Sequence, residues 1–283
     1  MHKINPKFLR PLLKKRETVS HKGDYGHLLL IGGCQSMPGA AVLATGAALK
    51  SGCGLVTLHS TARAVQAAVS AFPSAMLSED GGECFSRVPD GLLRITAIAV
   101  GPGLGRTAQA EETFASLLTR VKEQESPIPM VLDADALFIL AAHPELMKLI
   151  PAGSVMTPHE VELRRLISWN TPEEKELELK TLCKETGCVV VAKSHLTEIY
   201  TPEGEKYVNT TGNAGLAKGG SGDVLTGLVG GLLARGYSSL EAATLGVWIH
   251  GRAADALTAK YTAEAYSSRD LIDALYNGFK ALE

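Results

Sequence analysis

The stretch His27-Leu-Leu-Leu-Ile-Gly-Gly-Cys-Gln-Ser-Met-Pro-Gly-Ala-Ala41 decides the fold class of this chain. Its apolar beginning, His27–Ile31, predicts a short buried strand that stops at two glycines. The alanine- and leucine-rich run from Pro38 to Ser51 predicts a helix, with a proline in its first turn and Gly52 after its end. The glycine turn between strand and helix either packs or receives an anion or a flat substrate against bare backbone.

The same order of strand, glycine turn and helix recurs along the chain. Further strands are predicted at Leu55–Leu58, Ile95–Val100, Met130–Asp133, Ser154–Thr157 and Cys188–Ala192. Helices are predicted near Ala62–Ser70, Ala108–Lys122 and Glu173–Glu185, with a hairpin over Thr197–Val208 and helices after Asp223. This alternation predicts βαβ units and an α/β fold with a mostly parallel central sheet covered on both faces. We expect one domain over residues 1–283, which begins with a basic segment, residues 1–20.

The composition excludes several classes of protein. Hydrophobic residues make up 45% and charged residues 20% of the 283 residues, which is typical of a globular protein and not of a disordered one. A net charge of −2 gives no sign of a nucleic-acid partner, and no apolar run approaches the roughly 20 residues that span a bilayer. The basic segment lacks the apolar stretch of a secretory signal. Five scattered cysteines without a CxxC pair indicate reduced thiols, so we expect a cytoplasmic protein.

The segment Asn209-Thr-Thr-Gly-Asn-Ala-Gly-Leu-Ala-Lys-Gly-Gly-Ser-Gly-Asp223 carries the strongest functional signal. Its glycines allow backbone N–H groups to converge, and the hydrophobic run behind them predicts a helix start with further unpaired N–H groups. Together these features predict an anion site, most simply for a phosphate. Because a carboxylate beside a phosphate repels it, Asp223 is better explained as a base or a metal contact.

Polar residues follow other predicted strands, and parallel strands gather their carboxyl ends at one edge of the sheet. Asp133 and Asp135 end one strand, so that one can face the site while the other caps the next helix. In Gly101-Pro-Gly-Leu-Gly105 the GxGxG spacing and the proline argue against a dinucleotide loop and favour a substrate-lining loop. In Lys193-Ser-His-Leu-Thr197 the lysine offers a point charge to phosphate oxygens; a plain hairpin turn is the alternative.

Another candidate segment is Thr157-Pro-His-Glu160, which follows a predicted strand. We expect Thr157 to cap a helix that has the proline in its first turn and points His159 toward the crevice at the strand ends. Glu160 or Glu162 then holds Mg²⁺ through water, because this ion prefers oxygen ligands.

Taken in order, these motifs resemble the ADP-dependent NAD(P)H-hydrate dehydratases, which are ribokinase-like, carbohydrate-kinase-related domains that repair hydrated nicotinamide nucleotides. The match is most specific over Thr211–Gly227 and runs from about Lys22 to the C-terminus. It also includes Lys22–Gly26, Gly32-Gly33, Pro38–Ala41, Ser51–Thr57, Gly101–Gly105, Asp133–Leu137, Thr157–Glu160 and Lys193–Thr197.

The resemblance implies a ribokinase-like three-layer α/β/α sandwich and an enzyme that uses ADP or ATP with Mg²⁺. Such an enzyme dehydrates the S form of hydrated NADH or NADPH, restores NAD(P)H and releases AMP or ADP with phosphate. Asp223 is then the catalytic base, and Glu160 is the expected metal residue. The nucleotide is expected at Lys193, Ser194, His195, Leu196, Thr197, Asn213, Gly219, Gly220, Ser221 and Gly222. The hydrated substrate is expected at Ala40, Ala41, Gly103, His159 and Asp223.

Two residues depart from the pattern of the wider family. Thr157 stands where many kinases of the superfamily carry the Asn of an Asn-x-x-Glu magnesium motif, with Glu160 kept. Lys218 stands where a smaller residue is expected, and it either touches a nucleotide phosphate or faces solvent. Only about twenty residues precede the match, so an NAD(P)H-hydrate epimerase is expected as a separate partner protein. The family also favours a homo-oligomer, most often a tetramer.

Two other functions are compatible with these motifs. A ribokinase-like small-molecule kinase would phosphorylate a vitamin-precursor alcohol and leave the phosphate on its product. A non-catalytic nucleotide-binding protein would have no need of Asp223, so the carboxylate after the glycines makes this the weakest interpretation.

Overall fold

The computed structural model describes residues 1–283 and contains one ten-stranded sheet in the order β1-β10-β9-β8-β7-β6-β5-β2-β3-β4. The strands are β1 (His2–Lys3), β2 (His27–Ile31), β3 (Leu55–Ser60), β4 (Met76–Glu79), β5 (Ala97–Val100), β6 (Met130–Leu132), β7 (Val155–Met156), β8 (Val189–Ala192), β9 (Glu198–Tyr200) and β10 (Lys206–Val208). Neighbours from β4 to β8 pair in parallel. The predicted hairpin is β9–β10, which pairs antiparallel beside β8. The prediction of a mostly parallel α/β sheet is confirmed.

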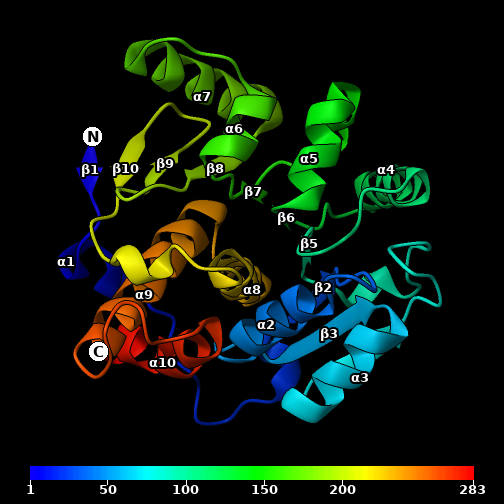
Figure 1. The fold of residues 1–283 in the computed structure, drawn as a ribbon, viewed down its shortest axis with the longest axis horizontal. Helices are drawn as coiled ribbons and strands as arrows, with labels where there is room; N and C mark the ends of the chain where they lie inside the picture. Colours follow the sequence, from blue (N-terminus) through cyan, green and yellow to red (C-terminus); the bar gives the residue numbers. More distant parts are fainter.

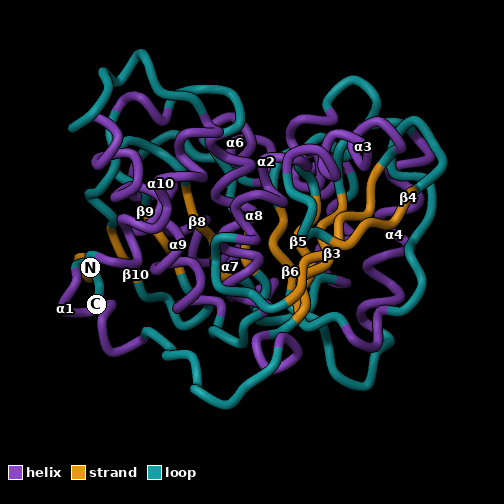
Figure 2. The backbone as a smooth tube through the Cα atoms, turned by 90° about the horizontal axis from the view of Figure 1, so that it is seen from below, coloured by secondary structure: helices purple, strands orange, loops and turns teal.

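Helices cover both faces of this sheet (Figure 1), and Figure 2 shows the strands enclosed between them. On one face lie α2 (Pro38–Leu49), α3 (Ala62–Ala71), α8 (Ser221–Ala234), α9 (Ser239–Thr258) and α10 (Ser268–Lys280). On the other lie α4 (Ala108–Lys122), α5 (Asp135–Ala142), α6 (Glu160–Leu166) and α7 (Pro172–Thr186). Successive strand residues serve opposite faces, so Leu28 packs in the first core and Leu29 in the second. The architecture is therefore a three-layer α/β/α sandwich.

Short 3₁₀ helices cover Arg10–Leu12, Lys22–Tyr25, Leu92–Arg94, Pro144–Leu149 and Ala214–Leu216. None of the helices combines the length and the apolar character that crossing a bilayer requires.

A glycine allows α8 to lie directly against α2. A Cβ atom at Gly227 would lie 1.9 Å from the backbone oxygen of Ala44, which no side chain permits. The hydroxyl of the preceding residue, Thr226, donates to Asp133 just after β6, at 2.6 Å. These contacts hold the first turns of α8 at the carboxyl end of the central strands.

The first part of the basic N-terminal segment is built into the sheet, whereas residues 14–20 are exposed. β1 pairs in parallel with β10 and forms one edge of the sheet. α1 (Pro6–Leu9) follows, and the Asn5 side chain caps it by accepting the N–H of Phe8 at 3.1 Å. Ile4 and Leu9 are buried in the same core as α9 and α10. Apolar residues between the lysines thus anchor this segment.

Candidate active site

A cavity of about 780 Å³ opens between the turn after β8 and the glycine-rich segment after β10. The expected nucleotide residues that line it are Lys193, Ser194, His195, Thr197, Asn213, Gly219, Ser221 and Gly222. The rest of the wall is formed by His159, Asn209, Thr211, Gly212, Ala214, Leu216, Ala217, Lys218, Leu225, Val247, His250 and Gly251. Leu196 and Gly220 are chain neighbours of the wall and not part of it. The fold thus brings together the two segments that the sequence singled out for a nucleotide.

The predicted anion cradle is the start of α8. Gly220 is its N-cap and has φ 91°, a conformation that favours glycine. A Cβ atom there would also lie 2.5 Å from Leu43 Cδ1 and 2.9 Å from Ser268 Oγ. No side chain caps this helix. The N–H group of Ser221 donates to the Lys218 oxygen at 3.3 Å, whereas the N–H group of Gly222 has no capping partner. An anion in the cavity is the ligand that such a helix start attracts.

The loop before α8 is shaped by the side chain of Asn213. Its Oδ1 accepts the N–H of Gly215 at 3.0 Å and the hydroxyl of Tyr266 at 2.9 Å. Its Nδ2 and the backbone N–H of Gly212 donate to the Asp255 carboxylate at 3.3 and 3.2 Å. Asn213 therefore shapes the cavity wall through contacts inside the protein, and its contact with a nucleotide stays a prediction.

Asp223 lies in the first turn of α8, within a group of acidic side chains. Burial raises its pKa to about 6, and the neighbouring carboxylates of Asp133, Asp135 and Glu162 add to the rise. The ammonium group of Lys193 opposes the rise by stabilising the charged form. A carboxylate with a pKa close to neutrality accepts a proton more readily than an ordinary aspartate does. The raised pKa is compatible with a general base, but Asp223 is not among the residues that line the cavity, and its catalytic role stays a prediction.

Lys193 is held in the cavity wall by Asp133, which follows β6. Its Nζ lies 2.8 Å from Asp133 Oδ1 and 4.0 Å from Glu162 Oε2. The second Asp133 oxygen is occupied by the Thr226 hydroxyl. Of the two aspartates that end this strand, Asp133 is thus the one that faces the site. Because Lys193 lines the cavity, bound phosphate oxygens would compete with Asp133 for its ammonium group.

Asp135 does not cap α5, so this part of the prediction is wrong. Its carboxylate accepts the N–H of Gly105 at 3.0 Å and pairs with Arg106 Nε at 2.5 Å. The helix begins at Asp135 itself, and the N-cap position belongs to Ala134, which has φ 49° and no side chain that can cap. Asp135 instead ties the loop after β5 to the start of α5.

The expected cap of α6 is also corrected by the structure. His159 is the N-cap: its Nδ1 accepts the N–H groups of Val161 and Glu162 at 3.1 and 3.3 Å. The Glu162 carboxylate completes a capping box by accepting the His159 N–H at 2.8 Å. Thr157 stays outside the helix because the backbone after it continues the sheet pairing, with the Lys193 N–H donating to the Pro158 oxygen at 2.8 Å. The Thr157 hydroxyl is buried without a partner.

Glu160, the expected metal residue, forms ion pairs with Lys175 at 2.9 Å and Arg164 at 3.4 Å. Glu162 is the glutamate of α6 that lies beside Lys193. No three His, Cys, Asp or Glu side chains converge as a metal-binding group. An Mg²⁺ ion that arrives on nucleotide phosphates needs only one or two carboxylates. The geometry therefore favours Glu162 over Glu160 for that contact.

His250 is a cavity residue that the sequence gave no reason to choose, because it lies in the middle of α9. Its Nε2 donates to the backbone oxygen of Ser221 at 3.0 Å. Burial lowers its pKa to about 4, so the ring is neutral at physiological pH. His250 thus fixes the first residue of the α8 helix start.

Three of the residues expected to bind the hydrated substrate, Ala40, Ala41 and Gly103, lie where the turns after β2 and β5 pack on each other. The other two lie elsewhere: His159 lines the nucleotide cavity and Asp223 is in the first turn of α8. The backbone oxygen of Gly103 accepts the Cys34 N–H at 2.5 Å. A Cβ atom at Gly103 would lie 2.7 Å from the Met37 oxygen and 3.3 Å from Ala40 Cβ. Ala40 is partly exposed, whereas Ala41 is fully buried. Binding of the substrate here stays a prediction.

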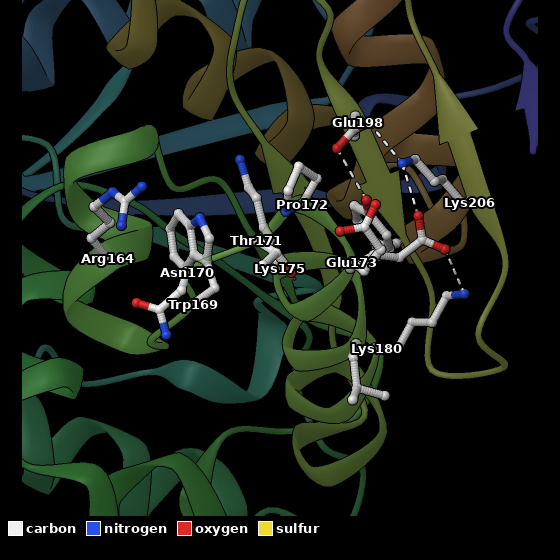
Figure 3. A pocket seen from close by; sticks show the side chains of 13 residues that line it. Arg164, Trp169, Asn170, Thr171, Pro172, Glu173, Lys175, Lys180, Glu198 and Lys206 are labelled. Carbon is white, nitrogen blue, oxygen red and sulfur yellow. Dashed lines mark hydrogen bonds and ion pairs between the residues drawn. The ribbon is translucent and has the colours of Figure 1, made fainter.

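A second cavity, also of about 780 Å³, lies between α7, the connection that precedes it and the β9–β10 hairpin (Figure 3). Its charged side chains largely pair with one another. Lys206 Nζ lies 2.8 Å from a Glu198 oxygen and 3.1 Å from a Glu176 oxygen. Glu176 also pairs with Lys180 at 2.7 Å. These ion pairs attach α7 to the β9–β10 hairpin.

The fold and the cavity together define a nucleotide-binding protein of the ribokinase-like class. A ribokinase-like superfamily protein of Enterococcus faecalis superimposes with a TM-score of 0.85 at 27% identity, covering 99% of this chain and 96% of that one. An ADP/ATP-dependent NAD(P)H-hydrate dehydratase of Bacillus subtilis, co-crystallised with ATP/Mg²⁺, gives a TM-score of 0.83 at 29% identity. That comparison covers 100% of this chain and 99% of the other. The ribokinase-like sandwich expected from the motifs is confirmed.

Sequence comparison narrows the class further. Residues 28–277 match the model of the NAD(P)H-hydrate dehydratase family. The ADP-dependent (S)-NAD(P)H-hydrate dehydratase of Neisseria meningitidis is 40% identical over 252 residues, which are 87% of this chain and 82% of the relative. A bifunctional NAD(P)H-hydrate repair enzyme of Moorella thermoacetica is 35% identical over 97% of this chain and 53% of its own length. The chain therefore belongs to the NAD(P)H-hydrate dehydratase family, as the motifs predicted.

Proposed function

We propose that this protein dehydrates the S form of hydrated NADH and NADPH with ADP or ATP as co-substrate. The products are NAD(P)H, phosphate, and AMP or ADP. The observation that supports this most directly is the position of Asp223: a partly buried carboxylate in the first turn of the helix whose start forms the anion cradle. The membership in the family supports the choice of substrate.

In the proposed mechanism the nucleotide phosphates lie in the cavity against Lys193 and the start of α8. Asp223 accepts the proton of the hydrate hydroxyl. The hydroxyl oxygen of the hydrate attacks the terminal phosphorus atom, and the bond from that phosphorus to the rest of the nucleotide breaks. The N–H groups of Gly220–Gly222 stabilise the charge on the transferring phosphoryl group. The phosphate then leaves with the electrons of its C–O bond, and loss of a proton from the neighbouring carbon restores the ring double bond.

Mg²⁺ is part of this proposal as the partner of the nucleotide. When bound, it would neutralise charge on the phosphate oxygens and orient them. Glu162 would hold it, because this carboxylate lies beside Lys193 while Glu160 is engaged with Lys175 and Arg164. One carboxylate together with phosphate oxygens and water is a usual environment for this ion.

The test is to incubate the protein with hydrated NADH and either ADP or ATP, and to follow the absorbance of NADH. We expect recovery with at least one nucleotide, and a loss of about 10²–10⁴ in rate for Asp223→Asn, because the general base is removed. The matched control is Asp90→Asn, which changes an exposed aspartate without an ion pair and should leave the rate unchanged. No recovery of NADH with either nucleotide would contradict the proposal. A stable phosphorylated hydrate would instead indicate a kinase.

We further propose a cytoplasmic location, a homo-oligomer and a functional pairing with a separate NAD(P)H-hydrate epimerase. The five free cysteines support the location, since thiols persist in a reducing compartment. The bifunctional repair enzyme among the relatives supports the pairing. Light scattering of the purified protein, and activity on a mixture of hydrate epimers with and without an epimerase, test the last two points.

A further inference from the structure

The ammonium group of Lys218 is surrounded by backbone carbonyl oxygens. Its Nζ donates to the oxygens of Ala263 at 2.7 Å, Glu264 at 2.9 Å and Tyr266 at 2.6 Å. It also lies 4.5 Å from the centre of the Tyr266 ring. A lysine has three N–H donors, and each has a carbonyl acceptor here. Although Lys218 is only partly buried, its ammonium group keeps no free N–H group for a phosphate.

These three carbonyl groups belong to the connection between α9 and α10, whereas Lys218 belongs to the wall of the nucleotide cavity. Two further hydrogen bonds join the same parts: Ser268 Oγ donates to the Gly219 oxygen at 2.8 Å, and the Tyr266 hydroxyl donates to Asn213 at 2.9 Å. The connection thus braces the glycine-rich segment immediately before the start of α8.

A cluster of carbonyl oxygens at these distances is an environment for a monovalent cation. Carbonyl oxygens can replace the hydration shell of K⁺, as they do in channel filters. Without a cation, the negative ends of three carbonyl dipoles would converge beside a site that receives phosphate. The charge of Lys218 cancels this unfavourable field and holds the oxygens in place.

We propose that Lys218 serves as a built-in monovalent cation, which keeps the anion cradle in the shape that binds nucleotide phosphate. It follows that removing this side chain creates a site for K⁺ or NH₄⁺ among the three carbonyl oxygens. The inference rests on the proposed function only in so far as the cradle binds a nucleotide.

Two substitutions separate charge from space. Lys218→Ala removes the ammonium group and leaves room for an ion, whereas Lys218→Met removes the charge but fills the space with a chain of similar length. Both variants are compared in choline chloride, KCl and NH₄Cl at equal ionic strength. Isothermal titration calorimetry measures ADP affinity, and scanning fluorimetry measures the unfolding midpoint without nucleotide. Lys184→Ala is the matched control, because Lys184 is an exposed lysine on α7 without a partner in the structure.

We expect Lys218→Ala to lose about tenfold or more in ADP affinity in choline chloride, as charge-assisted hydrogen bonds are lost. K⁺ or NH₄⁺ should restore most of this loss and raise the midpoint of this variant. Lys218→Met should show the loss without the rescue, and the wild type and Lys184→Ala should respond to none of the exchanges.

The inference would be overturned if the ADP affinity and unfolding midpoint of Lys218→Ala were the same in KCl and in choline chloride. It would also be overturned if the wild type itself needed K⁺ to bind ADP. The midpoint without nucleotide depends on no enzymatic activity. If the wild type bound neither ADP nor ATP, the proposed function would fail, while the effect of the cations on the unfolding midpoint of Lys218→Ala would still decide the inference.

Discussion

Replacing the proposed base, Asp223→Asn, should stabilise the protein, and the gain should grow with pH. The folded-state pKa of Asp223 is raised to about 6, from an ordinary value of 3.8, first by burial and then by Asp133. A group whose pKa is raised on folding favours the folded state while it is protonated, and this contribution is lost as the pH rises through the folded-state pKa. Above neutral pH, folding must therefore bury a charge that the unfolded chain leaves in water.

The two pKa values set the size of the effect. At pH 8 the ionised Asp223 lowers the free energy of unfolding by about 3 kcal/mol relative to the protonated group. At pH 5 the same calculation gives about 1.6 kcal/mol, because the folded-state carboxyl is then mostly protonated. An asparagine has its own cost of burial, but that cost does not change with pH. The gain from the substitution should thus be about 1.4 kcal/mol larger at pH 8 than at pH 5.

Urea denaturation followed by circular dichroism at the two pH values measures this difference, with Asp90→Asn as the exposed control. The control should shift the free energy of unfolding equally at both pH values. If the Asp223→Asn curve ran parallel to the wild type between pH 5 and pH 8, the carboxylate would not be buried as the structure has it. We expect the same variant to restore no NADH at any pH. A variant that is more stable but inactive would show that Asp223 serves activity at the expense of stability.

Three further predictions concern Asp223, Gly227 and Lys206. In the dehydration assay kcat/KM should fall about tenfold per pH unit below about pH 6, as Asp223 becomes protonated; a profile that stays flat down to pH 5 would exclude it as the base. Gly227→Ala should cost about 1–3 kcal/mol in urea denaturation because its Cβ meets the backbone of α2, whereas Gly39→Ala, which has open space, should be neutral or stabilising; equal effects would refute the close packing. Lys206→Met should cost about 1–3 kcal/mol by leaving two glutamates without their partner, while ADP affinity measured by calorimetry stays unchanged; a weaker ADP affinity would tie this ion-pair group to the nucleotide site.

Much of the fold could be predicted because its signals are local. Apolar runs closed by glycine turns located β2 and β5, and the valine-rich run after a charged helix located β8. Predicted strands alternate with predicted helices along the chain, which is the order that a parallel sheet requires. The helix caps were less predictable. His159 replaces Thr157 as the cap of α6 because a sheet-like bridge to Lys193 extends the backbone beyond the strand, and this bridge joins residues that are distant along the chain.

The site was predictable to the same extent. The glycine-rich segment and the turn after β8 were chosen correctly as neighbours of one cavity, because strand ends of a parallel sheet meet at one edge. The pairing of Lys193 with Asp133 and the support of Ser221 by His250 were not predictable. Such contacts depend on which side chains the packing of distant elements brings within reach.

By itself the sequence determined the α/β class, the family, the glycine cradle at the start of a helix and the carboxylate that ends it. Those properties depend on residues close together in the chain, whose spacing fixes turns, caps and unpaired N–H groups. Only the tertiary structure decided that Glu160 pairs with Lys175 while Glu162 faces Lys193, and that Lys218 binds three carbonyl groups instead of a phosphate. A charged side chain has several potential partners along a sequence, and the one it keeps is set by burial and geometry after the layers have packed.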